Sequence, residues 1–140
     1  MRTTWLSPLN IGSVRLESRV IMAPMTRSRA EHETDAPTAL NALYYAQRSG
    51  TGLIISEGTQ VSLQGQGYAC TSIIYSSEQR SGWKEVTHAV HEAGGLIAAQ
   101  LWHVGRISHF SILGEGEAPI VHPPYEQRRK FSSRTAKVRK

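Results

Sequence analysis

The fold is decided by the segment Leu96-Ile97-Ala98-Ala99-Gln100-Leu101-Trp102-His103-Val104-Gly105-Arg106. It opens with a short run of small or branched apolar residues after Gly94-Gly95, which is typical of a buried strand. The apolar run then gives way to an amide, an indole, an imidazole and a guanidinium. A strand that ends in such side chains either delivers them to a functional site or simply precedes a polar loop. Spacing alone favours neither.

Two more apolar runs of the same kind lie earlier in the chain. Residues 20–23 form an unbroken apolar run that Pro24 stops, and residues 53–56 form a second one. Long polar segments follow both runs, and we expect loops at residues 24–37 and 57–75. Short, unbroken apolar strands are expected where both faces of a parallel sheet are covered. The sequence therefore predicts three parallel strands.

Helical patterns separate these strands. The first helix is predicted to begin near Thr38 and to end at a left-handed cap on Gly50, because apolar residues recur at helical spacing between them. The second is predicted to follow a serine cap at Ser76 or Ser77 and to end at Gly94-Gly95. Its predicted buried stripe consists of Trp83, Val86, Val90 and Ala93.

The order strand, helix, strand, helix, strand indicates an α/β fold, preceded by a small predicted hairpin at residues 11–19. A doubly wound dinucleotide fold requires a glycine-rich turn directly after its first strand, whereas Pro24 and a long polar loop stand there. A TIM (β/α)8 barrel has long loops, and its site, at the C-terminal ends of its strands. We therefore predict the N-terminal portion of such a barrel, with about three β/α units.

The predicted barrel is incomplete. A complete one takes roughly 250 residues, and this chain has 140. Because three strands cannot close a barrel, we expect one sheet edge and a broad apolar face to stay open.

Composition excludes several classes of protein. No apolar run approaches the roughly 20 residues that a membrane span needs, and the N-terminus lacks the apolar core of a signal peptide. The lone cysteine, Cys70, excludes an intrachain disulfide and fits a cytoplasmic location. His88 and His91 lie three apart on the second predicted helix, but no further ligands stand near them. We therefore expect a solvated helix face there and no metal site.

Each strand end carries a motif of its own, and the loop at residues 57–75 contains a fourth. The motifs are Ala23-Pro24-Met25-Thr26-Arg27, Ser56-Glu57-Gly58-Thr59-Gln60, Gly67-Tyr68 and Gln100-Leu101-Trp102-His103-Val104-Gly105-Arg106. Together they resemble the old yellow enzyme family of FMN-dependent ene-reductases and NADPH dehydrogenases, and above all its bacterial N-ethylmaleimide reductase branch. The resemblance covers about residues 5–120. Each motif is weak alone, but four in register are specific.

The resemblance implies an FMN site at the C-terminal mouth of the barrel. Pro24, Met25 and Gly58 would contact the flavin largely through their backbone, although alanine is common at the position of Gly58 in this branch. Thr26 would donate a hydrogen bond to the carbonyl edge of the isoalloxazine and so tune its reduction. Gln100 would present a donor and an acceptor to the pyrimidine edge.

The resemblance also implies substrate-binding residues. Thr26 would serve the substrate as well as the flavin, and Tyr68 and Trp102 would form apolar walls over the flavin face. His103 is expected to orient its loop. The family's substrate-binding pair (His/His or His/Asn), its proton-donating tyrosine and its phosphate-binding loops are expected beyond the part that this chain matches. We therefore expect no catalytic residue within the chain.

The implied activity is hydride transfer from NAD(P)H through FMN to an activated alkene, of the enone, maleimide or nitro-compound class. The partners would be small molecules, with neither a membrane nor a nucleic acid among them. The alternative is a non-catalytic fragment or remnant of the family that holds no FMN.

The basic charge of the chain belongs to its tail. Residues 125–140 carry seven Lys or Arg against one acidic residue, whereas the first 124 residues carry nine against ten. The net charge of +5 therefore describes no basic face on the domain at residues 1–120. A tether to nucleic acid or to an anionic membrane is the alternative role for the tail. Its cations are clustered, but Tyr125 and Phe131 are its only aromatic residues.

The resemblance ends abruptly after residue 120. One choice of codons for the tail encodes, in another reading frame, a sequence close to the continuation that the family leads us to expect. We hypothesise a frameshift near residue 121, which would make 121–140 a disordered tail without a selected role. The nucleotide sequence tests this, because codons that cannot be reframed in this way contradict it.

Overall fold

Three parallel strands form the sheet that positions the site. In the computed structural model, which describes residues 4–114 and 118–120, the sheet has the order β3-β4-β5. Its strands are β3 (Ile21–Met22), β4 (Leu53–Gln60) and β5 (Ile97–Trp102). A separate antiparallel pair, β1 (Leu9–Ile11) and β2 (Val14–Leu16), precedes it. The predicted parallel sheet is confirmed, and the predicted hairpin is present but spans residues 9–16 instead of 11–19.

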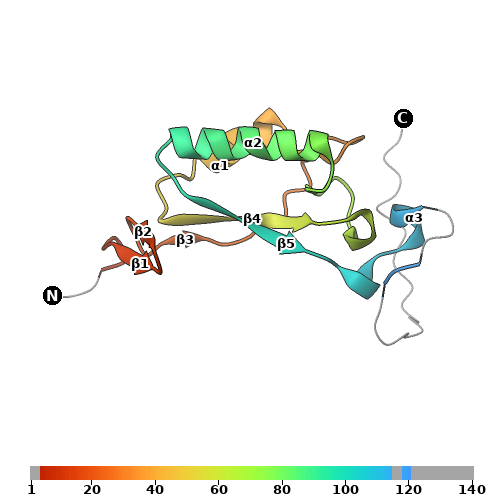
Figure 1. The fold of residues 1–140 in the computed structure, drawn as a ribbon, viewed down its shortest axis with the longest axis horizontal. Coiled ribbons are helices and arrows are strands. Elements are labelled where there is room, and N and C mark those ends of the chain that lie inside the picture. Colours follow the sequence, from red (N-terminus) through yellow and green to blue (C-terminus); the bar gives the residue numbers. More distant parts are fainter. Residues whose placement is uncertain (1–3, 115–117, 121–140) are drawn as a thin grey trace.

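Helices α1 (Ala39–Ala46) and α2 (Ser77–Glu92) cover one face of this sheet (Figure 1). The core lies between the two layers. It consists of Met22, Tyr45, Ile54, Trp83, Val86 and Val90. Short elements complete the described chain: η1 (Leu63–Gly65), η2 (Gly105–Ile107) and α3 (Phe110–Leu113).

Polar caps begin both helices where the sequence predicted them. Asn41 Oδ1 accepts a hydrogen bond from the Thr38 N–H at 2.9 Å, before α1. At α2, Ser76 Oγ accepts from the Gln79 N–H, and Gln79 Oε1 accepts from the Ser76 N–H at 2.8 Å. This reciprocal arrangement is a capping box, which satisfies the free donors of the first turn.

The helix ends differ in part from the prediction. Gly94 has a φ of +76° and ends α2 as predicted, but the left-handed cap predicted at Gly50 is wrong. Backbone bonds from Arg48 N–H to Tyr45 O and from Ser49 N–H to Ala46 O tighten the end of α1 instead. A helix whose last carbonyls are satisfied by such 3₁₀-type hydrogen bonds needs no residue at positive φ. Ala93 is exposed rather than buried, because it lies one residue past the last turn of α2.

The strand over residues 53–56 is longer than predicted. β4 continues to Gln60, and η1 follows within the predicted loop. Residues 57–60 are polar or glycine, so they lack the apolar pattern that marks a strand, yet residues 58–60 are paired with β5. The tail predicted at 121–140 lies outside the described residues.

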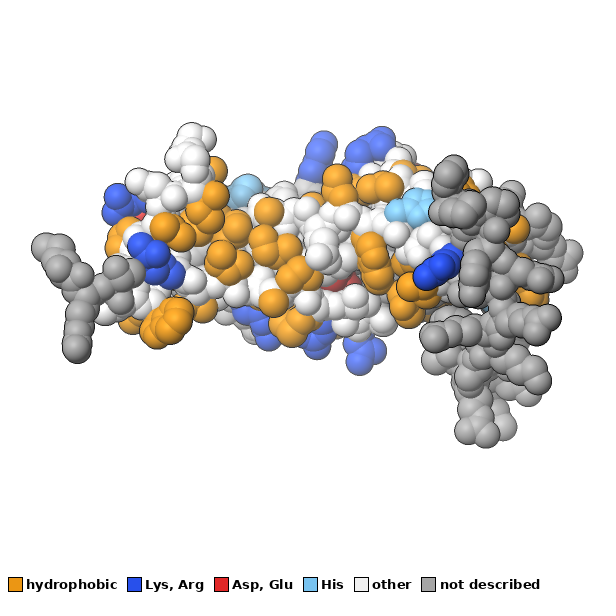
Figure 2. All heavy atoms as spheres, turned by 90° about the horizontal axis from the view of Figure 1, so that it is seen from below, with side chains coloured by type: hydrophobic (Ala, Val, Ile, Leu, Met, Phe, Trp, Pro, Cys, Tyr) orange, Lys and Arg blue, Asp and Glu red, His pale blue; other side chains and the backbone are white. Residues whose placement is uncertain are grey.

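The face of the sheet opposite the helices is open, as expected. The residues on it alternate with those of the core, and Ile21, Leu53, Ile55 and Ala98 are all half-buried or exposed. Figure 2 shows hydrophobic side chains spread along this face. No helix in the part of the chain that the structure describes is long and apolar enough to cross a membrane.

Candidate functional site

The predicted cofactor residues lie where the three parallel strands end. The C-terminal ends of parallel strands share one edge of a sheet, so the segment after β3, the end of β4 and the end of β5 are neighbours. Gly58 and Gln100 are direct partners across β4 and β5. Pro24, Met25 and Thr26 follow β3, and all three are exposed. The fold therefore brings residues far apart in the sequence to one edge.

Tyr68 and Trp102 form an aromatic stack beside Gly58. Their ring centroids are 5.7 Å apart and their planes are inclined by 20°. A Cβ atom at position 58 would overlap the Trp102 ring. Glycine therefore lets the indole lie directly against β4. The two residues predicted as apolar walls are brought together, although the substrate role assigned to them stays a prediction.

Gln100 and Trp102 lie on the open face of the sheet. Ile97 packs against the core beneath the helices, and side chains alternate along a strand, so positions 100 and 102 face the other way. In the described residues, no hydrogen bond is made by the Gln100 amide group or by the Thr26 hydroxyl. One donor–acceptor pair and one hydroxyl are thus available to a ligand, with the Gly58 backbone between them.

A β-bulge lies at Ser56–Glu57. Ile55 pairs with Ala98 and Gly58 pairs with Gln100, so two residues of β4 oppose one residue of β5. Both bulge residues are buried, with 0% of Ser56 and 1% of Glu57 exposed. The bulge thereby places two successive polar side chains away from the open face, where regular alternation would bury only one of them.

The Glu57 carboxylate collects hydrogen bonds from three segments. Its Oε2 accepts from the Arg27 backbone N–H at 3.1 Å, directly after Thr26. Its Oε1 accepts from the Ser72 hydroxyl at 3.3 Å and from the Asn41 amide of α1 at 3.5 Å. Tyr45 Oη accepts from the Glu57 N–H at 2.9 Å. Glu57 therefore links the segment after β3 to α1.

The residues of the bulge were missed by sequence reasoning. Glu57 belongs to a motif, but the sequence predicts a loop at residues 57–75 and indicates no role for its carboxylate. The available signal was an acidic residue directly after a buried strand and directly before a glycine. A carboxylate is rarely buried without partners, but the sequence does not show where those partners lie.

Burial sets the electrostatics of Glu57. Removal from water raises the pKa of its carboxyl above the usual 4.5, while the hydrogen bonds from Arg27, Ser72 and Asn41 and the charge of Arg27 act in the opposite direction. The Arg27 guanidinium lies 4.3 Å from the Tyr44 ring centroid. The charge of Arg27 offsets part of the cost of burying the carboxylate.

The raised pKa of Glu57 predicts a pH-dependent stability. The folded chain holds this proton more tightly than the unfolded chain, so the free energy of unfolding should fall as pH rises from about 4.5 through the raised pKa. Above that value the contribution is constant. Urea unfolding at a series of pH values should show this slope in the natural chain and a smaller slope in Glu57→Gln. Equal slopes in the two proteins would contradict the assignment.

Replacing Gly58 with alanine should displace the Trp102 ring. The new methyl group would overlap the indole, and the half-exposed ring can swing aside only by losing its stack with Tyr68. We expect a loss of about 1–3 kcal/mol in the free energy of unfolding and a shifted Trp102 indole N–H resonance. Gly50→Ala is the matched control, because its Cβ would meet no atom within 4 Å. An unchanged indole resonance would contradict the prediction.

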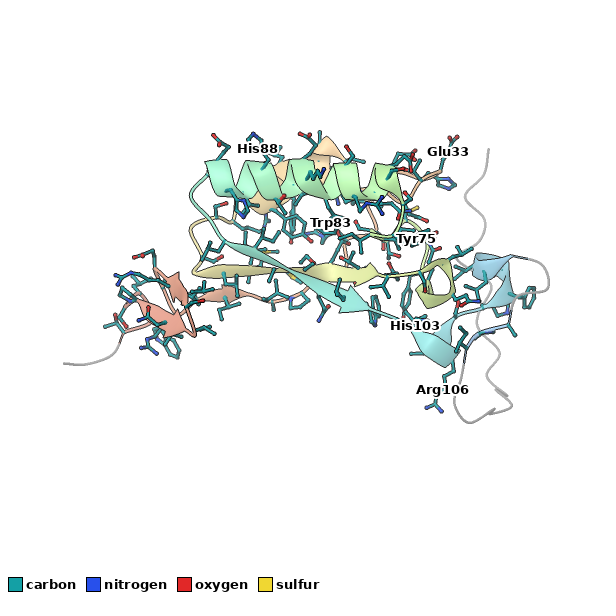
Figure 3. The ribbon with its side chains drawn as sticks, in the orientation of Figure 1. Glu33, Tyr75, Trp83, His88, His103 and Arg106 are labelled. Atoms are coloured by element: carbon teal, nitrogen blue, oxygen red, sulfur yellow. The ribbon has the colours of Figure 1, made fainter. Side chains whose placement is uncertain are left out.

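The histidines take the places that the sequence suggested. His103 Nδ1 accepts from the Gly105 N–H at 3.0 Å, which orients the loop after β5. Figure 3 shows Trp83 pointing from α2 toward the sheet, whereas His88 points away from it. His88 and His91 are both exposed. Within residues 4–114 and 118–120, no three His, Cys, Asp or Glu residues gather in a way that could hold a metal ion.

Comparison with known proteins gives a consistent result. A protein-family model described as the NADH:flavin oxidoreductase / NADH oxidase family matches residues 5–136, which extends past residue 120. Flavin oxidoreductase hxnT of Emericella nidulans is 46% identical over 118 residues, or 81% of this chain and 30% of the relative. For 12-oxophytodienoate reductase 7 of Oryza sativa subsp. japonica, the identity is 49% over 115 residues, or 81% and 29% of the two chains.

Solved structures agree with this match. Morphinone reductase in complex with tetrahydroNAD superposes with a TM-score of 0.80 at 47% identity, covering 84% of this chain and 32% of that one. The old yellow enzyme homologue from Zymomonas mobilis gives a TM-score of 0.79 at 43% identity, with the same coverage. The chain thus spans about 30% of the length of the curated relatives it matches. The predicted architecture, an N-terminal part of a TIM barrel, is confirmed.

Proposed function

Because the chain belongs to the NADH:flavin oxidoreductase / NADH oxidase family, we propose that its strand ends form one wall of an FMN site. The site would serve an NAD(P)H-dependent ene-reductase. The observation that carries the proposal is the juxtaposition at the sheet edge. Gly58 and Gln100 are cross-strand partners, the Gln100 amide is exposed, and the aromatic stack of Tyr68 and Trp102 lies beside them.

The residues present fit a flavin. An isoalloxazine is a flat ring system with a polar edge of alternating donors and acceptors. The Gln100 amide offers a donor and an acceptor in one plane, and the Thr26 hydroxyl offers a donor from the segment after β3, on the far side of β4. Pro24, Met25 and Gly58 would contribute backbone contacts.

The side chains of this wall would bind, orient and exclude water. Hydrogen bonds from Gln100 and Thr26 would fix the ring in its plane. A donor such as the Thr26 hydroxyl also stabilises negative charge at the edge that it contacts, which favours the reduced ring. Bound FMN would supply the hydride transfer from NAD(P)H to an activated alkene.

The substrate would meet the aromatic wall. The stack of Tyr68 and Trp102 offers apolar surface beside the flavin positions, which suits a flat, conjugated compound such as an enone, a maleimide or a nitroalkene. Relatives carry the names 12-oxophytodienoate reductase and morphinone reductase, which agree with this class of substrate. We also propose the cytoplasm as the compartment, on the basis of the single unpaired cysteine, Cys70.

A second candidate is a remnant that holds no FMN. The open apolar face favours it: Ile21, on the edge strand of the sheet, is 43% exposed. An isolated chain with such a surface would associate nonspecifically before it bound a cofactor. In this case, the strand ends would keep the family's residues but would bind no FMN.

A fusion separates the two candidates. Residues 1–120 of this chain would replace the matching N-terminal segment of morphinone reductase, and FMN would be titrated into the fusion and into the 140-residue chain. We expect the fusion to be yellow, with the absorbance of bound flavin, and to oxidise NADPH when an enone is present. A fusion that folds, as judged by circular dichroism, but takes up no FMN would contradict the proposed function. Binding by the 140-residue chain itself would exclude the remnant.

A further inference from the structure

We propose that the bulge residues Ser56 and Glu57 act as a positioning pair that sets how the three strand ends lie relative to one another. Neither side chain faces the open side of the sheet. Ser56 instead accepts a hydrogen bond from the backbone N–H of Gln100, which is assigned to the flavin. Glu57 accepts one from the backbone N–H of Arg27, which directly follows Thr26. The consequence for the cofactor rests on the proposed function, whereas the positioning itself is a property of the chain alone.

Ser56 replaces a missing acceptor in the sheet. Because β4 has one more residue than β5 at the bulge, the regular ladder of backbone hydrogen bonds is interrupted there. The Gln100 N–H donates to Ser56 Oγ at 3.0 Å instead. A buried N–H without a partner costs about 1–3 kcal/mol. The hydroxyl therefore fixes the backbone of β5 at the residue whose side chain is presented to the ligand.

Glu57 fixes the segment after β3. Its Oε2 accepts from the Arg27 N–H, which directly follows Thr26. The carboxylate is held in turn by the Ser72 hydroxyl and the Asn41 amide, so it is anchored on the side away from Arg27. This hydrogen bond joins residues 30 positions apart in the sequence. It ties an exposed segment to a buried group.

The two contacts share one short segment. Ser56 and Glu57 are consecutive, and Gly58 follows them directly. Further hydrogen bonds stiffen the segment: Ser56 Oγ donates to Glu57 O at 2.8 Å, and Thr59 Oγ1 donates to the same carbonyl at 2.9 Å. This rigid bulge is hydrogen-bonded to Arg27 on one side and to Gln100 on the other. It therefore fixes the positions of Thr26, Gly58 and Gln100 relative to one another. Preorganisation of this kind raises affinity by reducing the ordering that binding requires.

The test measures amide hydrogen exchange in the 140-residue chain and in two variants. In Glu57→Gln, the Arg27 N–H loses its charged acceptor, and we expect its exchange to become about tenfold faster or more. In Ser56→Ala, the Gln100 N–H should exchange faster by a similar factor while the Arg27 N–H is unchanged. Glu85→Gln, on the exposed side of α2, is the matched control and should alter neither amide.

The pattern of exchange decides between positioning and general support of the fold. A merely structural role would accelerate the core amides of Val86 and Val90 in α2 together with those of Arg27 and Gln100. Such uniform acceleration, or no acceleration at Arg27 and Gln100, overturns the proposal. If Glu57→Gln fails to fold, Ser56→Ala decides, since it removes one hydroxyl and leaves the carboxylate in place.

Flavin binding by the fusion protein gives an independent result. If Ser56 and Glu57 position the strand ends, Glu57→Gln and Ser56→Ala should each weaken FMN binding by about tenfold. If the unaltered fusion binds no FMN, the proposed function fails, and the exchange pattern still decides whether the pair positions the strand ends. If both variants of the fusion bind FMN as tightly as the unaltered fusion, the consequence for the cofactor is wrong while the proposed function stands.

Discussion

Replacing Trp83 with alanine is expected to lower the free energy of unfolding by about 3–5 kcal/mol. Trp83 points from α2 into the core, with 5% of its surface exposed, and its ring centroid lies 6.2 Å from that of Tyr45. Its Nε1–H donates to the Ile73 carbonyl at 3.2 Å. The substitution would thus remove the largest side chain of the core cluster and leave the buried Ile73 carbonyl without its donor.

Urea unfolding followed by circular dichroism measures this loss. Because a domain is typically stable by only about 5–15 kcal/mol, we expect the variant to be partly or wholly unfolded at room temperature. Trp83→Phe is the informative companion, since it retains most of the apolar volume and removes only the indole N–H. Its loss should be smaller, at about 1–3 kcal/mol. A Trp83→Ala variant as stable as the natural chain would show that the packing of Trp83 against the core contributes little to the free energy of unfolding.

Replacing Gln100 with leucine is expected to weaken FMN binding by the fusion protein about 10-fold to 100-fold. Leucine keeps the approximate volume but removes the donor and the acceptor that the proposal assigns to the flavin's polar edge. Leaving those groups of the ligand without partners costs about 1–3 kcal/mol, and 1.4 kcal/mol corresponds to a factor of ten. The stability of the fold should change little, because the Gln100 side chain is exposed and its backbone N–H remains bonded to Ser56.

Flavin fluorescence during titration gives the dissociation constant. Gln64→Leu, the same substitution at an exposed residue of η1, serves as the control and should bind FMN as the unaltered fusion does. Equal affinity in the Gln100→Leu and Gln64→Leu variants would show that the amide makes no contact with the flavin. The proposed cofactor contact would then rest on the segment after β3 and on Gly58 alone.

Much of this architecture is predictable from local patterns. Apolar runs such as residues 53–56 mark strands, because a strand buried on both faces needs apolar residues throughout. The stripe of Trp83, Val86 and Val90 marks the buried side of α2, because its spacing follows the helical period. Glycine at position 94 marks the end of α2, because this residue adopts a positive φ.

The residues of the site could be predicted from the sequence, but the contacts that hold them in position could not. Gln100 and Trp102 follow a predicted strand, so their delivery to the sheet edge could be anticipated. The pairing of Gly58 with Gln100 and the contact of Gly58 with Trp102 could not, since both depend on a bulge that shifts the register of β4 against β5. No local pattern indicates that shift, because residues 57–60 lack apolar alternation and the sequence predicts a loop there.

The amino-acid sequence by itself determined the order of strands and helices, the open apolar face and the residues that reach the edge of the sheet. The order and the residues at the edge follow from hydrophobic periodicity, which is a local property, and the open face follows from the presence of only three predicted strands. Only the tertiary structure decided that Glu57 is buried and which groups surround it. Its partners Arg27, Asn41 and Ser72 stand 30, 16 and 15 positions away. They meet the carboxylate because helix packing and strand register bring them together, and neither of these is encoded in any short stretch of the chain.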